Sequence, residues 1–373
     1  MSSVVDYIRE YGKYTFSEKK FNEVDAAVLS SITYLDFNNI VSDKKNPINM
    51  SGAIDYFLNH YDMKKFMKRG FIQKDIIRVA KEIKDTIRYR NIVLYNYVYD
   101  VTYNKQFCAI TMKLPTGEKL IVYEGTDHDL VGWEEDFTML YQFPVPADTD
   151  AINYLNDNVS IWDKNVIVLG HSKGGHLAMT AATFCKWYKK FAIKKVYNFD
   201  GPGFRYDEFN SKKFKRMTKK LEYIIPNYSI FGLLLRHPEE VKVVKTTKKD
   251  IMAHSMFNWL VEEENFVFDR LSRISRNLDK SIIMWLEQHD DEERKKVVTD
   301  VFKYLKDNGI EKITDMVKLK NVFTLIKDTR CSSSSSMSAA LSLFFSIESS
   351  AFLSHFSLVS ENFANRKIPP LIY

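Results

Sequence analysis

The sequence has few cysteines. Its three cysteines, Cys108, Cys185 and Cys331, lie far apart among 373 residues. This sparse, odd count excludes a disulfide framework and a zinc site built from paired cysteines. It is typical of a reducing compartment, so we expect a cytoplasmic protein. The first residues lack the basic start and apolar run of a signal peptide, and no run of about 18 charge-free apolar residues predicts a membrane span.

Motifs that bind metals, nucleotides or nucleic acids are also missing. The sequence has no His-Glu-x-x-His, no Gly-x-x-x-x-Gly-Lys and no dinucleotide-binding glycine pattern, so we expect no metal and no cofactor. The net charge is +6, but the basic runs are scattered among acidic residues, so we expect no nucleic-acid binding. The charge is compatible with weak peripheral contact with an anionic membrane, and residues 339–359 predict an amphipathic tail. No protein partner is indicated.

The sequence contains enough apolar residues for a large core. Hydrophobic residues make up 45% of the chain and aromatic residues 14%. The spacing of apolar residues in Phe21–Ile32 predicts an amphipathic helix, followed by more helix to about Arg90. Runs of β-branched and aromatic residues then predict strands at 91–103, 106–114, 120–123, 165–169, 195–199, 221–225 and 241–244.

The connections between these strands predict their directions. The short turn at 115–118 favours antiparallel pairing of its two neighbours. From residue 165 onward strands alternate with helices, beginning with a helix from Lys173 to about Lys189, which predicts a mostly parallel sheet covered by helices on both faces. Beyond Asn265, residues 271–305 predict one or two amphipathic helices. The serine run at 331–337 predicts a soft linker.

One motif indicates a catalytic serine. Gly170-His171-Ser172-Lys173-Gly174 follows an apolar strand and precedes an alanine-rich helix, which is the context that the G-x-S-x-G nucleophile elbow requires. The sharp turn strains the serine backbone and leaves room only for very small residues at Gly170 and Gly174. A Gly/Ser turn that matches by accident is the alternative, but the flanking strand and helix favour a nucleophilic Ser172.

An activated serine needs a base, which follows it in the chain order of this architecture. His254 follows the last predicted strand by a short loop, which would lie at the carboxyl edge of the sheet beside the serine. The other seven histidines precede the serine, lie on its own helix or lie outside that edge: His60, His128, His171, His176, His237, His289 and His355. We therefore predict His254 as the base, with a structural histidine as the alternative.

The acid that orients the base is less constrained. Asp200 ends the strand at 195–199 and would emerge at the same sheet edge as the serine, so we predict it as the acid. The alternative is that Asp200 only forms hydrogen bonds with the Gly201-Pro202-Gly203 turn. Other carboxylates in looser loops also remain open: Asp207, Glu239, Glu240 and Asp250.

An oxyanion hole needs backbone N–H groups beside the serine. The N–H of Lys173, at the start of the helix, is one donor that we predict. Thr126, in Glu124-Gly125-Thr126-Asp127 at the end of the 120–123 strand, is the other. An ordinary turn after a strand is the alternative for this segment.

These motifs together resemble lipase class 3-type α/β-hydrolases and, more narrowly, the Mbeg-like bacterial family of unknown function. The matching segments, between about Phe21 and Glu264, are 21–25, 123–126, 132–137, the serine elbow, 199–204 and 254–259. The resemblance implies an ester-hydrolysing serine enzyme with Thr126 at the oxyanion position and Gly132-Trp133 on the covering segment. Class 3 lipases place their acid one strand later, where this sequence has Ser229, so Asp200 would serve from the neighbouring strand.

The sequence therefore predicts an α/β-hydrolase with a mostly parallel central sheet and a helical C-terminal region. We divide the chain into a hydrolase domain over residues 1–265, with a helical N-terminal segment, and a helical region of unknown role over 266–373. The predicted activity is cleavage of a small-molecule or lipid ester by a Ser-His-Asp mechanism through an acyl-enzyme. The alternatives are a catalytically inactive binding or scaffolding protein on the same fold, and a hydrolase for a thioester, a peptide or another acyl acceptor.

Overall fold

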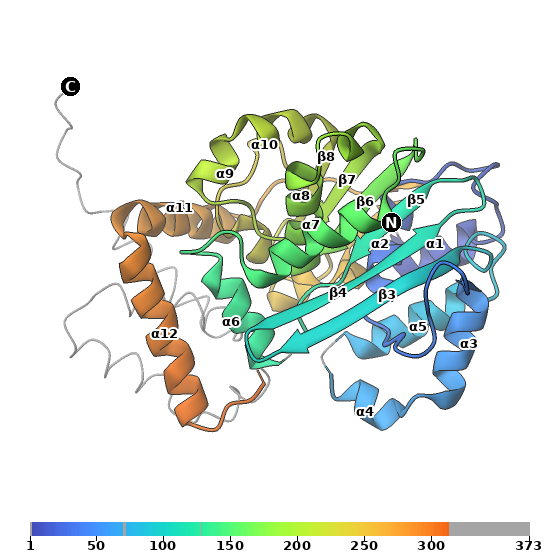
Figure 1. Cartoon of the computed structure of the whole chain (residues 1–373), viewed down its shortest axis with the longest axis horizontal. Helices are drawn as coiled ribbons and strands as arrows, with labels where there is room; N and C mark the ends of the chain where they lie inside the picture. Colours follow the sequence, from blue (N-terminus) through green and yellow to red (C-terminus); the bar gives the residue numbers. More distant parts are fainter. Residues whose placement is uncertain (1, 70–71, 128, 313–373) are drawn as a thin grey trace.

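A computed structural model describes residues 2–69, 72–127 and 129–312. The predictions for 331–337 and 339–359 lie outside the described residues, as does Cys331. An eight-stranded sheet crosses the protein between two layers of helices, in the order β2-β3-β4-β5-β6-β7-β8-β9 (Figure 1). Its strands are β2 (Ile48–Asn49), β3 (Val93–Thr102), β4 (Lys105–Lys113), β5 (Lys119–Tyr123), β6 (Val166–His171), β7 (Ile193–Phe199), β8 (Leu221–Pro226) and β9 (Lys242–Val244).

The strand directions agree with the sequence predictions. The strands β2 to β5 pair antiparallel, including β4 and β5 across the short turn. The strands β5 to β9 pair parallel. The sequence did not predict the short strand β2 or a small second sheet that joins the two ends of the hydrolase region. That sheet consists of β1 (Ser2–Ser3), β10 (Leu260–Glu262) and β11 (Asn265–Phe266).

One face of the sheet is covered by the helices of the N-terminal segment. These are α1 (Val4–Tyr11), α2 (Glu23–Ile32), α3 (Met50–His60), α4 (Met63–Met67) and α5 (Gln73–Ile83). The helix α2 lies directly on β5, β6 and β7 and is buried along its whole length. The predicted amphipathic pattern of this helix was therefore wrong. Because α5 and β11 pack against α2 as well, it has no solvent face.

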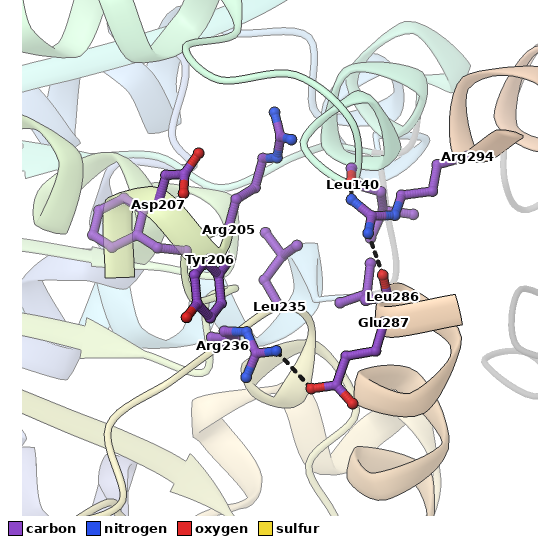
Figure 2. A pocket seen from close by; sticks show the side chains of 10 residues that line it. Leu140, Arg205, Tyr206, Asp207, Leu235, Arg236, Leu286, Glu287 and Arg294 are labelled. Atoms are coloured by element: carbon purple, nitrogen blue, oxygen red, sulfur yellow. Dashed lines mark hydrogen bonds and ion pairs between the residues drawn. The ribbon is translucent and has the colours of Figure 1, made fainter. Parts of the chain in front are cut away.

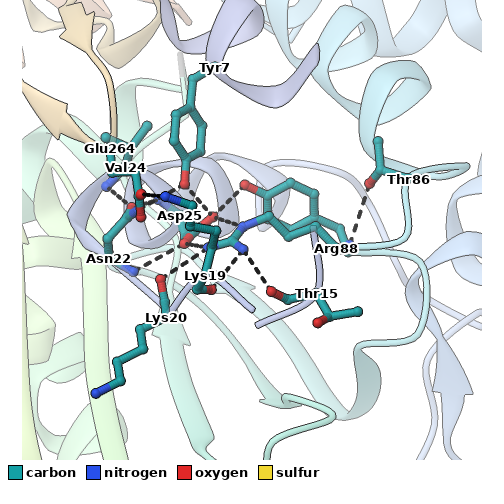
Figure 3. Close-up of polar contacts among 11 residues, drawn as sticks. Tyr7, Thr15, Lys19, Lys20, Asn22, Val24, Asp25, Thr86, Arg88 and Glu264 are labelled. Carbon is teal, nitrogen blue, oxygen red and sulfur yellow. Dashed lines mark hydrogen bonds and ion pairs between the residues drawn. The ribbon is translucent and has the colours of Figure 1, made fainter. Parts of the chain in front are cut away.

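A buried charge cluster fixes α2 to its surroundings (Figure 3). The side chains of Asp25 and Arg88 form an ion pair with no solvent exposure. Asp25 also accepts hydrogen bonds from the hydroxyl groups of Tyr89, at 2.6 Å, and Tyr7, at 3.2 Å. The Arg88 guanidinium donates in addition to the carbonyl of Lys19 at 3.0 Å. Since both charges are paired and hydrogen-bonded, loss of one partner would leave the other charge buried and uncompensated.

The opposite face carries α7 (Pro146–Asn158) and α8 (Lys173–Phe184). The side chains of β5 alternate between the faces: Leu120 and Val122 enter the core beside α2, whereas Ile121 and Tyr123 enter the core beside α7 and α8. The helix α8 ends at Phe184, earlier than predicted, and a 3₁₀ turn follows at Lys189–Phe191. Two short helices, α9 (Tyr206–Asn210) and α10 (Lys212–Met217), precede β8.

The remaining helices extend the molecule at one end (Figure 1). The helix α6 (Leu130–Thr138) follows β5. Two helices, α11 (Arg273–Gln288) and α12 (Asp291–Asp307), occupy the region 271–305 where one or two were expected. A separate apolar cluster joins α12 to α6, with Val298, Phe302 and Leu305 buried near Leu130 and Phe137. The fold is thus that of an α/β-hydrolase with C-terminal helices. Among the described residues no helix has the length and apolarity needed to cross a membrane.

Candidate active site

The strand β6 and the helix α8 meet in a sharp turn at Ser172. Its backbone has φ 58° and ψ −133°, a conformation that non-glycine residues rarely adopt. A Cβ atom at Gly170 would lie 2.2 Å from the carbonyl oxygen of Gly174, and one at Gly174 would lie 2.2 Å from the carbonyl oxygen of Tyr123. Only glycine fits at both positions, which is the steric requirement that a nucleophile elbow imposes.

Asp200 and His254 meet at the carboxyl edge of the sheet. Asp200 directly follows β7, and its Oδ2 atom lies 2.6 Å from Nδ1 of His254 in the 3₁₀ turn Ile251–His254. Its other oxygen, Oδ1, accepts hydrogen bonds from the Ser229 hydroxyl at 2.5 Å and from the Gly232 N–H at 3.0 Å. Within the described residues Asp200 is the carboxyl group that contacts the His254 imidazole. Asp250, an alternative acid, instead caps the turn through the Met252 N–H.

Burial shifts the pKa values of both Asp200 and His254. Asp200 has no solvent exposure, and burial raises the pKa of its carboxyl group, opposed by the hydrogen bonds from Ser229 and Gly232. Burial lowers the pKa of His254, which favours the neutral imidazole. Because Nδ1 faces the carboxylate, we assign the imidazole proton to Nδ1. The Nε2 atom of the neutral ring is then available to accept a proton.

Ser172 and His254 line the same cavity, which has a volume of about 90 Å³. In the described part of the chain no hydrogen bond joins the Ser172 hydroxyl to the imidazole, and such contacts are often long before substrate binds. The wall beside the imidazole is aromatic. The ring of Phe231 lies 4.2 Å from that of His254, and Trp133 packs edge-on against Phe231 at 5.6 Å. Ile251 and Met252 also line this apolar side of the cavity.

Thr126 and Lys173 lie on the two segments that flank the serine. Thr126 lines the cavity, and its hydroxyl donates to Oδ2 of Asp136 at 2.5 Å. Lys173 is the first residue of α8. Among the described residues the backbone N–H groups of Thr126 and Lys173 have no hydrogen-bond acceptor. Two free donors beside the serine are what an oxyanion hole requires.

The side chain of Lys173 has a contact that the sequence did not reveal. Its ammonium group is buried and ion-paired with Glu135, and it donates to the carbonyl of Gln106 at 3.1 Å. Asp136 lies 3.5 Å away. Burial raises the pKa of Asp136 to about 6, opposed by Lys173 and by the Thr126 hydroxyl. This cluster holds the N-terminus of α8, the Thr126 loop and α6 together.

His171, which precedes the serine, is a second residue whose contacts sequence reasoning missed. Its Nδ1 lies 2.9 Å from the Tyr34 hydroxyl, its Nε2 lies 2.9 Å from the carbonyl oxygen of His254, and the two imidazole rings are 4.4 Å apart. Burial lowers the pKa of His171 to about 3, so the ring is neutral. Nε2 therefore donates to the His254 carbonyl and Nδ1 accepts from Tyr34. The only signal for this residue in the sequence was its place inside the elbow motif.

The other described histidines make contacts away from the cavity. His176 is buried against Asp148, and His237 contacts Asp279. His60 and His289 each hydrogen-bond to a carbonyl one turn back on their own helices. His128 and His355 lie outside the described residues.

A larger cavity, of about 360 Å³, lies between the segment around α9 and the helices α11 and α12 (Figure 2). Three arginines line it, but each already has partners in the protein. Arg236 pairs with Glu287, whereas Arg205 and Arg294 both pair with Asp291. Its lining has no serine, cysteine or histidine that could act as a nucleophile or base. Chemistry therefore favours the smaller cavity at Ser172 as the candidate active site.

The mostly parallel eight-stranded sheet between two layers of helices defines the α/β-hydrolase class of folds. Within that class the chain belongs to the Mbeg1-like family, whose model matches residues 83–303. This confirms the family resemblance drawn from the sequence, and the match continues through α11 and into α12. Among solved structures, the chain is similar to one titled "Crystal structure of M37 lipase", at 14% identity and a TM-score of 0.33, over 71% of this chain and 81% of that one. No curated protein matches.

Proposed function

We propose that this protein is a serine hydrolase that cleaves a carboxylic ester through an acyl-enzyme. Ser172 attacks the ester carbonyl carbon while His254 accepts the hydroxyl proton, and the same proton then passes to the departing alcohol. Water, deprotonated by His254, then attacks the acyl carbon; the bond to the Ser172 oxygen breaks, His254 returns the proton to that oxygen, and the acid is released. The observation that carries the proposal is the Asp200–His254 contact of 2.6 Å at a cavity that Ser172 also lines.

The surrounding residues have separate roles in this proposal. Asp200 keeps the imidazole proton on Nδ1 and stabilises the imidazolium that forms during each proton transfer. The N–H groups of Thr126 and Lys173 bind the negative charge that develops on the carbonyl oxygen. None of these steps requires a metal or an organic cofactor. The apolar wall formed by Trp133 and Phe231 favours an acyl or lipid ester with a hydrocarbon group.

The contact of Ser229 is compatible with Asp200 as the catalytic acid. A binding or scaffolding protein was an alternative because Ser229 stands where class 3 lipases have their acid. In this protein Ser229 donates its hydroxyl hydrogen bond to the carboxylate of Asp200, one strand away. Ser229 thus provides one of the hydrogen bonds that the buried Asp200 carboxyl group needs if the acid comes from β7. A thioester, a peptide or another acyl acceptor would use the same residues.

The proposal is tested with chromogenic esters of graded acyl length. We expect turnover by the parent protein, and a loss of roughly 10³-fold or more in kcat for Ser172→Ala and for His254→Ala. The matched control is His237→Ala, which removes a partly buried histidine that pairs with a different carboxylate. Ester turnover that is unchanged in His254→Ala, or lost equally in the control, would refute the assignment. The 1–265 and 266–373 division and a cytoplasmic location remain proposals from the sequence.

A further inference from the structure

Large apolar side chains are exposed at the edge of the sheet that lies opposite Ser172. Trp162 is 82% exposed, Trp187 and Phe191 are each 72% exposed, and Ile161 is 62% exposed. Ile161 and Trp162 lie in the connection from α7 to β6, and Trp187 and Phe191 lie in the connection from α8 to β7. Soluble proteins seldom expose several such side chains together unless the surface binds something.

The two connections lie side by side. The Lys186 N–H donates to the Asn156 side chain at 2.9 Å, and the Lys189 ammonium donates to the Val159 carbonyl. The rings of Trp187 and Phe191 are 6.0 Å apart. We call this surface the amino-edge patch; its apolar members are Ile161, Trp162, Trp187, Tyr188 and Phe191.

Positive charge surrounds the amino-edge patch. Residues 186–195 contain five lysines and residues 212–220 contain five lysines and one arginine, with no Asp or Glu in either segment. The segments touch, because the Lys220 ammonium donates to the carbonyl oxygens of Lys190, at 2.9 Å, and Ile193, at 2.7 Å. The helix α10, inside the second segment, packs against α8 (Figure 1). Seven of these cations are exposed on the surface: Lys186, Lys194, Lys212, Lys213, Lys215, Arg216 and Lys219.

The acidic residues near the patch do not neutralise it. Asp163 is ion-paired with Lys119, and Glu222 is ion-paired with Lys195 and Lys242. Asp157, at the end of α7, is exposed. The patch therefore combines exposed indole rings with an excess of positive charge, outside any residue used in the proposed chemistry.

We propose that the amino-edge patch docks this protein on an anionic phospholipid surface. Tryptophan side chains favour the level of the lipid headgroups, and each Lys or Arg beside them gains from the negative surface potential. Ile161 favours the lipid over a nucleic acid, since an aliphatic side chain has no ring on which a base could stack.

The docking would also set the direction that the active site faces. Ser172 and Asp200 follow the carboxyl ends of β6 and β7, whereas the patch precedes their amino ends. Strands of this length separate the two edges by roughly 20 Å. The cavity at Ser172 would thus open away from the lipid, toward substrate that arrives from the aqueous side.

The first experiment measures sedimentation with vesicles of phosphatidylcholine, with and without phosphatidylserine. We expect binding only to the vesicles that contain phosphatidylserine, weaker binding as salt is raised, and a blue shift of tryptophan fluorescence on binding. Replacing Lys213, Lys215 and Arg216 by Gln should weaken binding by roughly 100-fold at low salt, about fivefold for each cation. The double variant Trp162→Ala/Trp187→Ala should weaken it by roughly tenfold or more.

Matched controls use residues outside the patch. Tyr103→Ala removes an aromatic ring that is 87% exposed on the β3–β4 turn, and Lys44→Gln/Lys45→Gln removes two exposed cations from another loop. Both should bind vesicles as the parent does. Ser172→Ala should also bind normally, so a failure of the docking proposal is distinguishable from a failure of the proposed hydrolase activity.

Three outcomes would overturn the docking proposal. The first is vesicle binding that the patch variants and the control variants share equally. The second is binding of a single-stranded oligonucleotide, but not of vesicles, that the patch variants abolish. The third is self-association through the patch, seen as a concentration-dependent mass in the parent that the tryptophan double variant loses, without vesicle binding.

Discussion

Glu124 provides a test of how burial controls charge beside the site. This residue follows β5 and precedes the Gly125-Thr126 turn, and only 3% of it is exposed. Burial raises the pKa of Glu124 to about 8, opposed by the Arg69 guanidinium and by a hydrogen bond with the Cys108 thiol. The folded protein therefore keeps a proton on this carboxyl group at neutral pH, whereas the unfolded chain releases it.

The sign and size of the effect on stability follow from this difference. Between the unfolded pKa of 4.5 and the folded pKa of about 8, the folded state binds more protons, so the stability contributed by Glu124 falls as the pH rises. At about 1.4 kcal/mol for each pH unit, the loss at pH 7 is about 3 kcal/mol. Glu124→Gln, which cannot ionise, should avoid this loss and should be more stable than the parent at neutral pH.

The measurement is the free energy of unfolding in urea at several values of pH. The stability advantage of Glu124→Gln should be below about 1 kcal/mol at pH 5 and should grow to about 3 kcal/mol at pH 7. Glu135→Gln is the matched contrast, because Glu135 is equally buried but ion-paired with Lys173. That variant should lose about 3–5 kcal/mol, since it removes the main partner of a buried ammonium group. An advantage of Glu124→Gln that is absent, or that shrinks with rising pH, would show that Glu124 does not hold a proton in the folded protein.

Three further substitutions test other parts of the account. Ser229→Ala removes a hydrogen-bond donor that lowers the pKa of Asp200. The acid limb of the pH profile of kcat/KM should therefore move to higher pH by about 1–2 units. An acid limb that does not move would show that Ser229 does not control the ionisation of Asp200. Gly174→Ala places a Cβ atom 2.2 Å from a backbone oxygen and should lower both the melting temperature and ester turnover, whereas the control Gly52→Ala on α3 meets no atom nearer than a side-chain oxygen at 3.1 Å and should leave ester turnover unchanged. Arg88→Met leaves Asp25 buried without its ion pair and should cost about 3–5 kcal/mol of unfolding free energy in urea titrations; a loss below about 1 kcal/mol would show that the pair is not needed.

The order of strands and helices could be predicted because most strands are short runs of apolar residues that stand out in the sequence. The runs that became β5 and β6 are nearly continuous apolar residues, as strands covered on both faces require, and those that became β7 and β8 are about half β-branched and aromatic residues. Which sides of each helix are buried could not be predicted equally well. The apolar spacing of α2 looked one-sided, but α5 and β11 bury its polar side through contacts that no local pattern encodes.

The same distinction holds at the candidate site. Ser172 was recognisable because its turn requires very small residues at neighbouring positions, and the sequence has Gly170 and Gly174 there. Asp200 and His254 are 54 residues apart, yet parallel strands bring their carboxyl ends to one edge, so topology was enough to pair them. The pairing of Lys173 with Glu135 depends on how α6 folds back over the sheet, which the sequence does not reveal.

The most direct test of the account is covalent labelling with a fluorophosphonate probe, followed by mass spectrometry of the labelled peptide. We expect phosphorus to attach to the hydroxyl oxygen of Ser172. We also expect His254→Ala to react much more slowly while remaining folded, and Ser172→Ala not to react. Attachment at a different serine, or no reaction in a folded parent protein, would contradict the central claim that this elbow holds an activated nucleophile.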